Sequence, residues 1–119
     1  PLYIAAQKGR ETCLRALLGA RACVDEATKI GATPLYIAAE TGQEACLRAL
    51  LGARAHVDEA KKDGTTPLLI AAQKGQEECL RALLGARARM DKAANDVVTP
   101  LYIAAQKGRE TCLRALPRA

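Results

Sequence analysis

The amino-acid sequence repeats itself at a fixed spacing, and this repetition limits the possible folds more than any local pattern does. Prolines recur with a step of 33 residues, at Pro1, Pro34, Pro67 and Pro100. The segment PLYIAAQKGRETCLRAL at 1–17 returns unchanged at 100–116. A repeat of this length indicates a stack of similar units, each of which contacts only its neighbours.

Each unit is predicted to contain two short helices. Thr33 and Pro34 are typical of a helix start, because the threonine hydroxyl can accept an unpaired backbone N–H and proline loses no hydrogen bond at the first helical position. Gly42 is expected to end this first helix. A second helix is expected from near Glu44, where Cys46 and the leucines after it recur with helical spacing.

Polar connectors follow the second helices at 22–33, 55–66 and 88–99. Their turn-forming residues predict extended turns, with hairpin-like fingers as one form that they could take. Helices of about two to three turns do not persist alone in water. Units that stack side by side would instead bury their leucines in one continuous core.

The composition agrees with short helices that pack closely. Half of the 119 residues are apolar, but the chain has no Trp, no Phe and three Tyr. Small aliphatic side chains suit such helices and provide little material for a large β core. We therefore predict an all-α fold.

Three strings in the first helices carry a family resemblance: TPLYIAA at 33–39, TPLLIAA at 66–72 and TPLYIAA at 99–105. With the G-x-E-x-C-L-x-x-L-L run from Gly42 to Leu51, they resemble the ankyrin repeat, whose hallmark is T-P-L-H-x-A. The resemblance implies an ankyrin-type α-solenoid of stacked antiparallel helix pairs with short β-turn or hairpin connectors. It also implies a single domain over 1–119, with repeats at about 1–30 (partial), 31–63, 64–96 and 97–119 (partial).

The sequence departs from the ankyrin pattern in two columns of positions. The hallmark histidine is replaced by Tyr3, Tyr36, Leu69 and Tyr102. The tyrosines either anchor a partner or pack between repeats. The glycine that usually follows the second helix is replaced by Arg21, Arg54 and Arg87. An arginine at positive φ would cost about 1–2 kcal/mol, so we expect these helices to end sooner or to fray.

A third departure lies in the last connector. Val97 stands where the other connectors have Gly31 and Gly64. A β-branched residue tolerates positive φ poorly, so we predict that this connector is distorted.

No arrangement typical of a catalytic site is present, so we expect neither an enzyme nor a cofactor or metal. The chain has no histidine base beside a nucleophile, no phosphate-binding loop and no glycine-rich fingerprint. His56 is the only histidine and is expected to be a solvated turn residue. Cys23 is a candidate for a free, modifiable thiol. The cysteines that repeat in register are expected to fill the core: Cys13, Cys46, Cys79 and Cys112.

The net charge of +5 favours acidic partners. Nucleic acid is an unlikely partner, because the charges are mixed in sign and single-strand readers usually carry stacking aromatics. One arginine column follows glutamates by four residues and is expected to form a solvated, ion-paired face: Arg15, Arg48, Arg81 and Arg114. The column of Arg21, Arg54 and Arg87 lacks such an acid, which makes it the better candidate for binding an anion.

The sequence also carries signals for the cellular compartment and for self-association. The chain has no apolar run long enough to span a membrane, and its first residues do not resemble a signal peptide. The chain has an odd number of cysteines, five, and their regular spacing argues against a disulfide framework and for a reducing intracellular compartment, cytoplasmic or nuclear. Neither end carries an obviously polar capping repeat, and Pro117 interrupts the last helix. The chain could therefore be a fragment or an engineered piece, and head-to-tail self-association through its ends is possible.

The ankyrin resemblance implies a non-catalytic module that binds or scaffolds another protein, possibly an acidic one, with a concave face formed by the first helices and finger tips. The alternatives are a structural, engineered or self-assembling stack and, less favoured, a nucleic-acid-binding protein. Carried over by position, the concave face comprises Gln7, Lys8, Lys29, Ile30, Ala32, Tyr36, Glu40, Thr41, Lys62, Asp63, Thr65, Gln73, Lys74, Asn95, Asp96, Val98, Gln106 and Lys107.

Overall fold

The computed structural model describes residues 2–88 together with Tyr102, Gln106, Glu110 and Arg114. Between residues 2 and 88 the chain forms six helices and no strand. The helices are α1 (Leu2–Lys8), α2 (Glu11–Gly19), α3 (Pro34–Thr41), α4 (Glu44–Gly52), α5 (Pro67–Lys74) and α6 (Glu77–Gly85).

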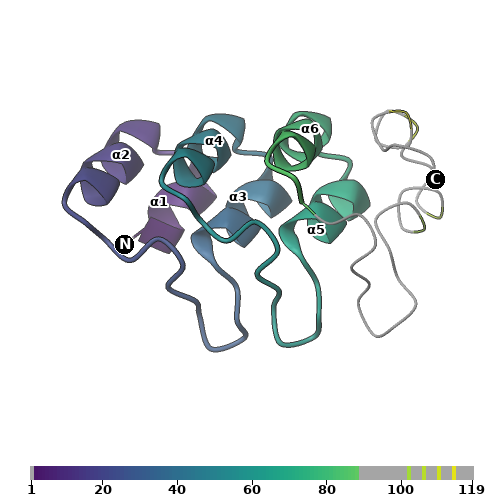
Figure 1. The fold of residues 1–119 in the computed structure, drawn as a ribbon, viewed down its shortest axis with the longest axis horizontal. Coiled ribbons are helices and arrows are strands. Elements are labelled where there is room, and N and C mark those ends of the chain that lie inside the picture. Colours follow the sequence, from purple (N-terminus) through teal and green to yellow (C-terminus); the bar gives the residue numbers. More distant parts are fainter. Residues whose placement is uncertain (1, 89–101, 103–105, 107–109, 111–113, 115–119) are drawn as a thin grey trace.

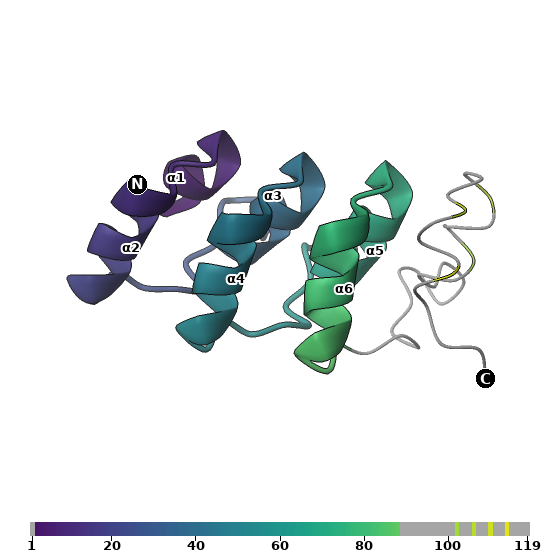
Figure 2. The same cartoon turned by 90° about the horizontal axis from the view of Figure 1, so that it is seen from above.

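The helices form two layers (Figure 1). α1, α3 and α5 form an inner layer, and α2, α4 and α6 form an outer layer, with each pair antiparallel and next to the following pair (Figure 2). Within the inner layer α3 packs against both α1 and α5, and in the outer layer α4 packs against α2 and α6. The predicted all-α solenoid of stacked helix pairs is confirmed.

Helix starts and ends follow the sequence signals. The Thr33 hydroxyl accepts a hydrogen bond from the Tyr36 N–H at 3.2 Å, and Pro34 follows it as the first helical residue. Thr66 caps α5 in the same way. Gly42 ends α3 with φ 75°, a left-handed conformation that glycine adopts without steric cost. These predicted caps are confirmed.

One hydrophobic core runs through all three helix pairs. Leu35 of α3 and Leu47 of α4 are fully buried, and so are their counterparts Leu68 and Leu80. Because no single pair could cover these leucines, their burial requires the next pair, as the repeat pattern predicts. None of the described helices combines the length and the apolar character that a membrane crossing demands.

Glutamine side chains join successive pairs where the inner helices end. The Gln43 Nε2 donates to the Gln7 carbonyl at 3.4 Å, and the Gln76 Nε2 donates to the Glu40 carbonyl at 3.1 Å. Gln76 lies so close to Gly42 that a Cβ atom added there would come within 2.5 Å of the Gln76 Oε1. A carbonyl at the end of α1 and another at the end of α3 are thus each satisfied by a side chain from the following repeat.

The repeating cysteines are divided between core and surface. Cys46 and Cys79 are buried, and their thiols lie 3.9 and 3.8 Å from the Ala5 and Ala38 carbonyls, which confirms them as core fillers. For Cys13 that prediction is wrong, because Cys13 is exposed. Cys112 lies outside the described residues.

The first two connectors form hairpin-like fingers, one of the forms predicted for them. The Thr28 N–H donates to the Ala32 carbonyl, and the Lys61 N–H donates to the Thr65 carbonyl, each at 2.9 Å. The fingers also contact each other, since the Lys62 N–H donates to the Ile30 carbonyl at 3.0 Å. Residues 89–99 of the third connector, including Val97 and its predicted distortion, lie outside the described residues.

The second helices end before the arginines, as expected, but the expectation that this ending spares the arginines from positive φ is wrong. α4 ends at Gly52, but Arg54 still adopts φ 66°. Arg21 and Arg87 adopt φ 65° and 67°.

Hydrogen bonding at the helix end explains this conformation. The Arg54 N–H donates to the Leu51 carbonyl and the Ala55 N–H donates to the Leu50 carbonyl, both at 3.0 Å. A left-handed residue lets the chain fold back over the helix end and make these bonds. Each arginine therefore retains strain of about 1–2 kcal/mol that a glycine would not have.

Candidate binding surface

The inner surface comprises α1, α3, α5 and the tips of the first two fingers, 28–32 and 61–65. The fingers project from the side of the stack on which the inner helices lie (Figure 1). Side chains of three repeats thus face one side of the molecule, where a partner could contact them together.

The described residues of the predicted concave face differ in their exposure. The exposed ones are Lys8, Lys29, Ile30, Thr41, Lys62, Asp63, Lys74 and Gln106. The half-buried ones are Gln7, Glu40, Thr65 and Gln73. Ala32 and Tyr36 are buried and therefore offer a partner little surface. The remaining members lie outside the described residues: Asn95, Asp96, Val98 and Lys107.

Tyr36 and Lys61 contact each other on the inner surface. The Lys61 Nζ lies 5.0 Å from the centroid of the Tyr36 ring, in a cation–π arrangement. It also lies 3.8 Å from the Asp63 Oδ2. A residue of the second finger is thereby fixed against α3.

The ionisable groups around this contact influence one another. Burial raises the pKa of Tyr36, although Lys61 opposes the change. Burial works against the charge of Lys61, but its interactions with Tyr36, Asp63 and Glu40 leave its pKa raised. The pKa of Tyr3 is raised by burial and by Glu40. Lys61 therefore keeps its positive charge on the inner surface.

The negative Asp63 has its own partners. Its Oδ1 accepts the Thr65 N–H at 2.9 Å, and this bond is the main cause of its lowered pKa. By contrast, Lys8, Lys29, Lys62 and Lys74 are exposed and form no ion pair within the described part of the chain. Positive charge is therefore the more available kind on the inner surface.

The tyrosines do not share one role. Tyr36 packs between repeats with 4% of its surface exposed, whereas Tyr102 is 48% exposed. Tyr3 is half-buried on α1. Packing therefore accounts for Tyr36.

Sequence reasoning missed Lys61. Its column holds Thr28 and Ala94 in the neighbouring copies, so the repeat pattern carries no signal for a lysine there. The contact depends on the finger folding back over α3, which only the structure shows.

The outer surface carries ion pairs along the helices, as predicted. The guanidinium groups of Arg15, Arg48 and Arg81 each lie 2.7 Å from a glutamate one turn earlier. Arg114 pairs with Glu110 in the same way. Because these pairs are largely exposed, each contributes only about 0.3–0.5 kcal/mol.

His56 and Cys23 occupy equivalent positions after the second helices, and both are exposed. The backbone N–H of His56 donates to the Asp25 Oδ1 at 3.0 Å. The side chain of His56 is 73% exposed. The predicted solvated turn residue is confirmed, and the thiol of Cys23 is accessible. Among residues 2–88 and the four described later positions, no three metal-binding side chains gather in one place.

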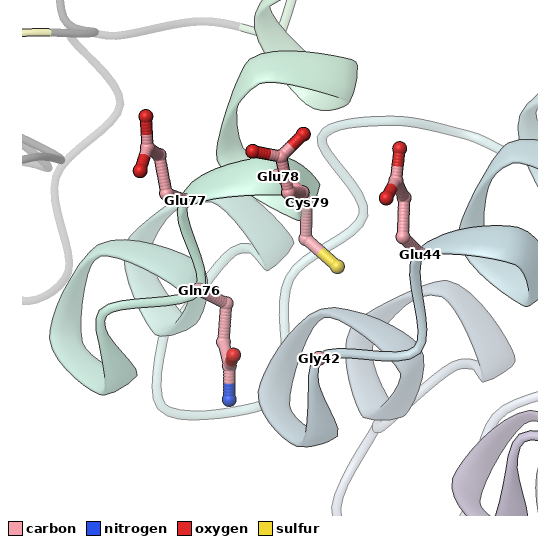
Figure 3. A pocket seen from close by; sticks show the side chains of 6 residues that line it. All are labelled: Gly42, Glu44, Gln76, Glu77, Glu78 and Cys79. Carbon is pink, nitrogen blue, oxygen red and sulfur yellow. The ribbon is translucent and has the colours of Figure 1, made fainter.

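A pocket of about 200 Å³ lies at the seam between successive repeats (Figure 3). It is lined by Gly42, Glu44, Gln76, Glu77, Glu78 and Cys79. Two of its carboxylates already form ion pairs with arginines, and burial raises the pKa of the Cys79 thiol to about 11. This pocket thus presents neither a free cation site nor a reactive thiolate.

Stacked helix pairs with threonine–proline starts, glycine ends and finger connectors define a helical-repeat solenoid. The sequence matches the family model of ankyrin repeats (three copies) over residues 1–61 and 52–118. The chain belongs to the ankyrin repeat family.

A solved structure agrees with this assignment. The crystal structure of the human ASB11 ankyrin repeat domain is 30% identical, with a TM-score of 0.87 over 96% of this chain. The match covers 51% of that domain, so the chain spans about half its length. No curated protein matches the chain. Ankyrin repeats are generally protein–protein interaction modules, and their fold is typically non-catalytic.

Proposed function

We propose that the chain is a non-catalytic module that binds an acidic protein through its inner surface. The observation that carries the proposal is a row of exposed lysines on inner helices and finger tips that form no ion pair with another described residue: Lys8, Lys29, Lys62 and Lys74. Asp63, in contrast, is already engaged by Lys61 and Thr65. An acidic partner would therefore meet positive charge for which no described residue competes.

The lysines and the finger contribute in different ways. Flexible lysines act as point charges that steer a partner and accelerate its association. Ile30, which is 57% exposed at the first finger tip, offers apolar contact area beside them. The Lys61–Tyr36 contact holds the second finger against α3, so the surface loses little freedom on binding.

The test compares two variants that each remove three positive charges. K8Q/K62Q/K74Q neutralises the inner surface, and R15Q/R48Q/R81Q neutralises the outer one. Partner proteins captured from a cell lysate on each immobilised variant are quantified by mass spectrometry. We expect the inner variant to lose acidic proteins that wild type and the outer variant retain. Equal recovery by both variants would contradict the proposal.

A second candidate function, head-to-tail self-association, is favoured by the exposed face of the first helix pair. Ile4 is 52% exposed, whereas its counterpart Ile37 is 3% exposed because a neighbouring pair covers it. In the same helix pair Cys13 is exposed, whereas its counterpart Cys46 is buried. We propose that a second copy of the chain could cover this face. Sedimentation velocity at rising concentration, on wild type and I4K, tests it; a wild type that stays monomeric would exclude it.

A further inference from the structure

Three arginines form a row at the ends of the outer helices, which we name the arginine ridge: Arg21, Arg54 and Arg87. All three are exposed, and none forms a hydrogen bond or ion pair through its side chain with another described residue. All three are also in the left-handed conformation, with φ between 65° and 67°. The ridge thus combines available charge with backbone strain at the same position of each repeat.

The fold itself does not require arginine at these positions. The hydrogen bonds that close each helix end use the backbone N–H, which a glycine would supply without strain. A cation near a helix C-terminus is favourable, but a residue with negative φ, such as Ala53, could carry that charge equally well. Strain that the surrounding structure does not use is most often found where a side chain has a functional role.

The spacing of the ridge suits an extended chain. α2, α4 and α6 pack side by side, and packed helices lie about 8–10 Å apart. An extended peptide in the polyproline II conformation has three residues per turn and advances about 3.1 Å per residue, so every third side chain returns to the same face about 9 Å further on and would meet the next arginine. A guanidinium group can bind a carboxylate through two parallel hydrogen bonds.

We propose that the arginine ridge binds an extended acidic peptide that presents a carboxylate at every third residue. The nearby carboxylate of Asp25 does not compete, because it accepts the His56 N–H. The ridge lies at the ends of the outer helices, whereas the inner surface is formed by α1, α3, α5 and the finger tips. It is therefore a second binding surface, and its occupancy does not depend on the function proposed above.

The experiment measures fluorescence anisotropy of a labelled peptide that has glutamate at every third position and serine elsewhere. R21G/R54G/R87G removes the ridge, and R15Q/R48Q/R81Q is the matched control with the same loss of charge. We expect the Kd to rise about tenfold or more in the ridge variant and to stay within about twofold in the control, since only the ridge variant loses the arginines that would pair with the peptide carboxylates.

Thermal unfolding provides a second readout. Replacing strained arginines by glycine should raise the melting temperature by about 5 °C, so that the variant is more stable while it binds more weakly. If the melting temperature of the variant is raised, its loss of binding cannot come from unfolding. The inner-surface variant K8Q/K62Q/K74Q should bind this peptide as wild type does, which separates the ridge from the inner surface.

Several outcomes would overturn the proposal. Unchanged affinity of the ridge variant, or an equal loss in the matched control, would show that the ridge is not the binding site. Equal affinity for a peptide of the same composition with its glutamates clustered would exclude the spacing argument. Tighter binding of single-stranded DNA to the ridge would assign it to nucleic acid instead of an acidic peptide.

Discussion

Gly42 and Gln76 provide a direct test of how successive repeats are joined. Gly42 has φ 75°, and an added Cβ would lie 2.5 Å from the Gln76 Oε1. In Gly42→Ala the left-handed alanine costs about 1–2 kcal/mol. The flexible Gln76 side chain can also move away, but it then loses its hydrogen bond to the Glu40 carbonyl, which contributes about 0.5–1.5 kcal/mol. We expect Gly42→Ala to lower the free energy of unfolding by about 2–3 kcal/mol.

A double-mutant cycle separates the two contributions. Gln76→Ala alone should cost only the hydrogen bond, about 1 kcal/mol. In the double variant the clash is absent, so its loss should fall short of the sum of the single losses by about 1 kcal/mol. Urea denaturation followed by circular dichroism measures all three variants.

Gly52 is the matched control within the same repeat. A Cβ added at Gly52 meets no atom within 4 Å, and the residue is helical. Gly52→Ala should therefore stabilise the protein, by up to about 1 kcal/mol. The reasoning would be refuted if Gly42→Ala were as stable as wild type, or if the two losses in the cycle were additive.

Three further predictions concern the core, the thiols and the second finger. Leu47→Ala should lower the free energy of unfolding by about 2–5 kcal/mol in urea denaturation, because Leu47 is fully buried; a loss below about 1 kcal/mol would contradict the shared core. At mildly alkaline pH, iodoacetamide should modify the exposed Cys13 and Cys23 before Cys79, whose thiol has a pKa of about 11, as followed by peptide mass spectrometry; faster modification of Cys79 would show that it is not buried. Asp63→Asn should destabilise the protein slightly near neutral pH but not in strong acid, as thermal unfolding across pH would show. The pKa of Asp63 in the folded protein lies below the ordinary value of an aspartate side chain, so its stabilising effect is present above that ordinary value and is lost as pH falls through the lowered pKa. A destabilisation of Asp63→Asn that persists in acid would disprove this.

The parts of the fold that local chemistry determines could be predicted from the sequence. Thr33, Pro34 and Gly42 specify a helix by interactions within a few residues, and the structure has that helix. The pairing of Arg48 with Glu44 also follows from spacing alone. Because the repeats have a fixed period, a local prediction made for one repeat applies to the equivalent residues of the others.

Features that arise from competition or from distant contacts could not be predicted in this way. Whether Arg54 would adopt positive φ depended on weighing strain against the hydrogen bonds of the helix end, and the bonds prevail. The exposure of Cys13 depends on what lies beside its helix pair, and the residues around Cys13 do not determine this. Lys61 meets Tyr36 only because the finger folds back over α3.

The glutamine contacts have a consequence for the length of the protein. Gln43 joins the second pair to the first through the same amide-to-carbonyl bond by which Gln76 joins the third to the second. Because the two junctions are built alike, a duplicate of residues 34–66 could be inserted at either of them and find matching partners on both sides. The chain can therefore be lengthened one module at a time, with each insertion extending the inner surface and the ridge without redesign of the existing modules.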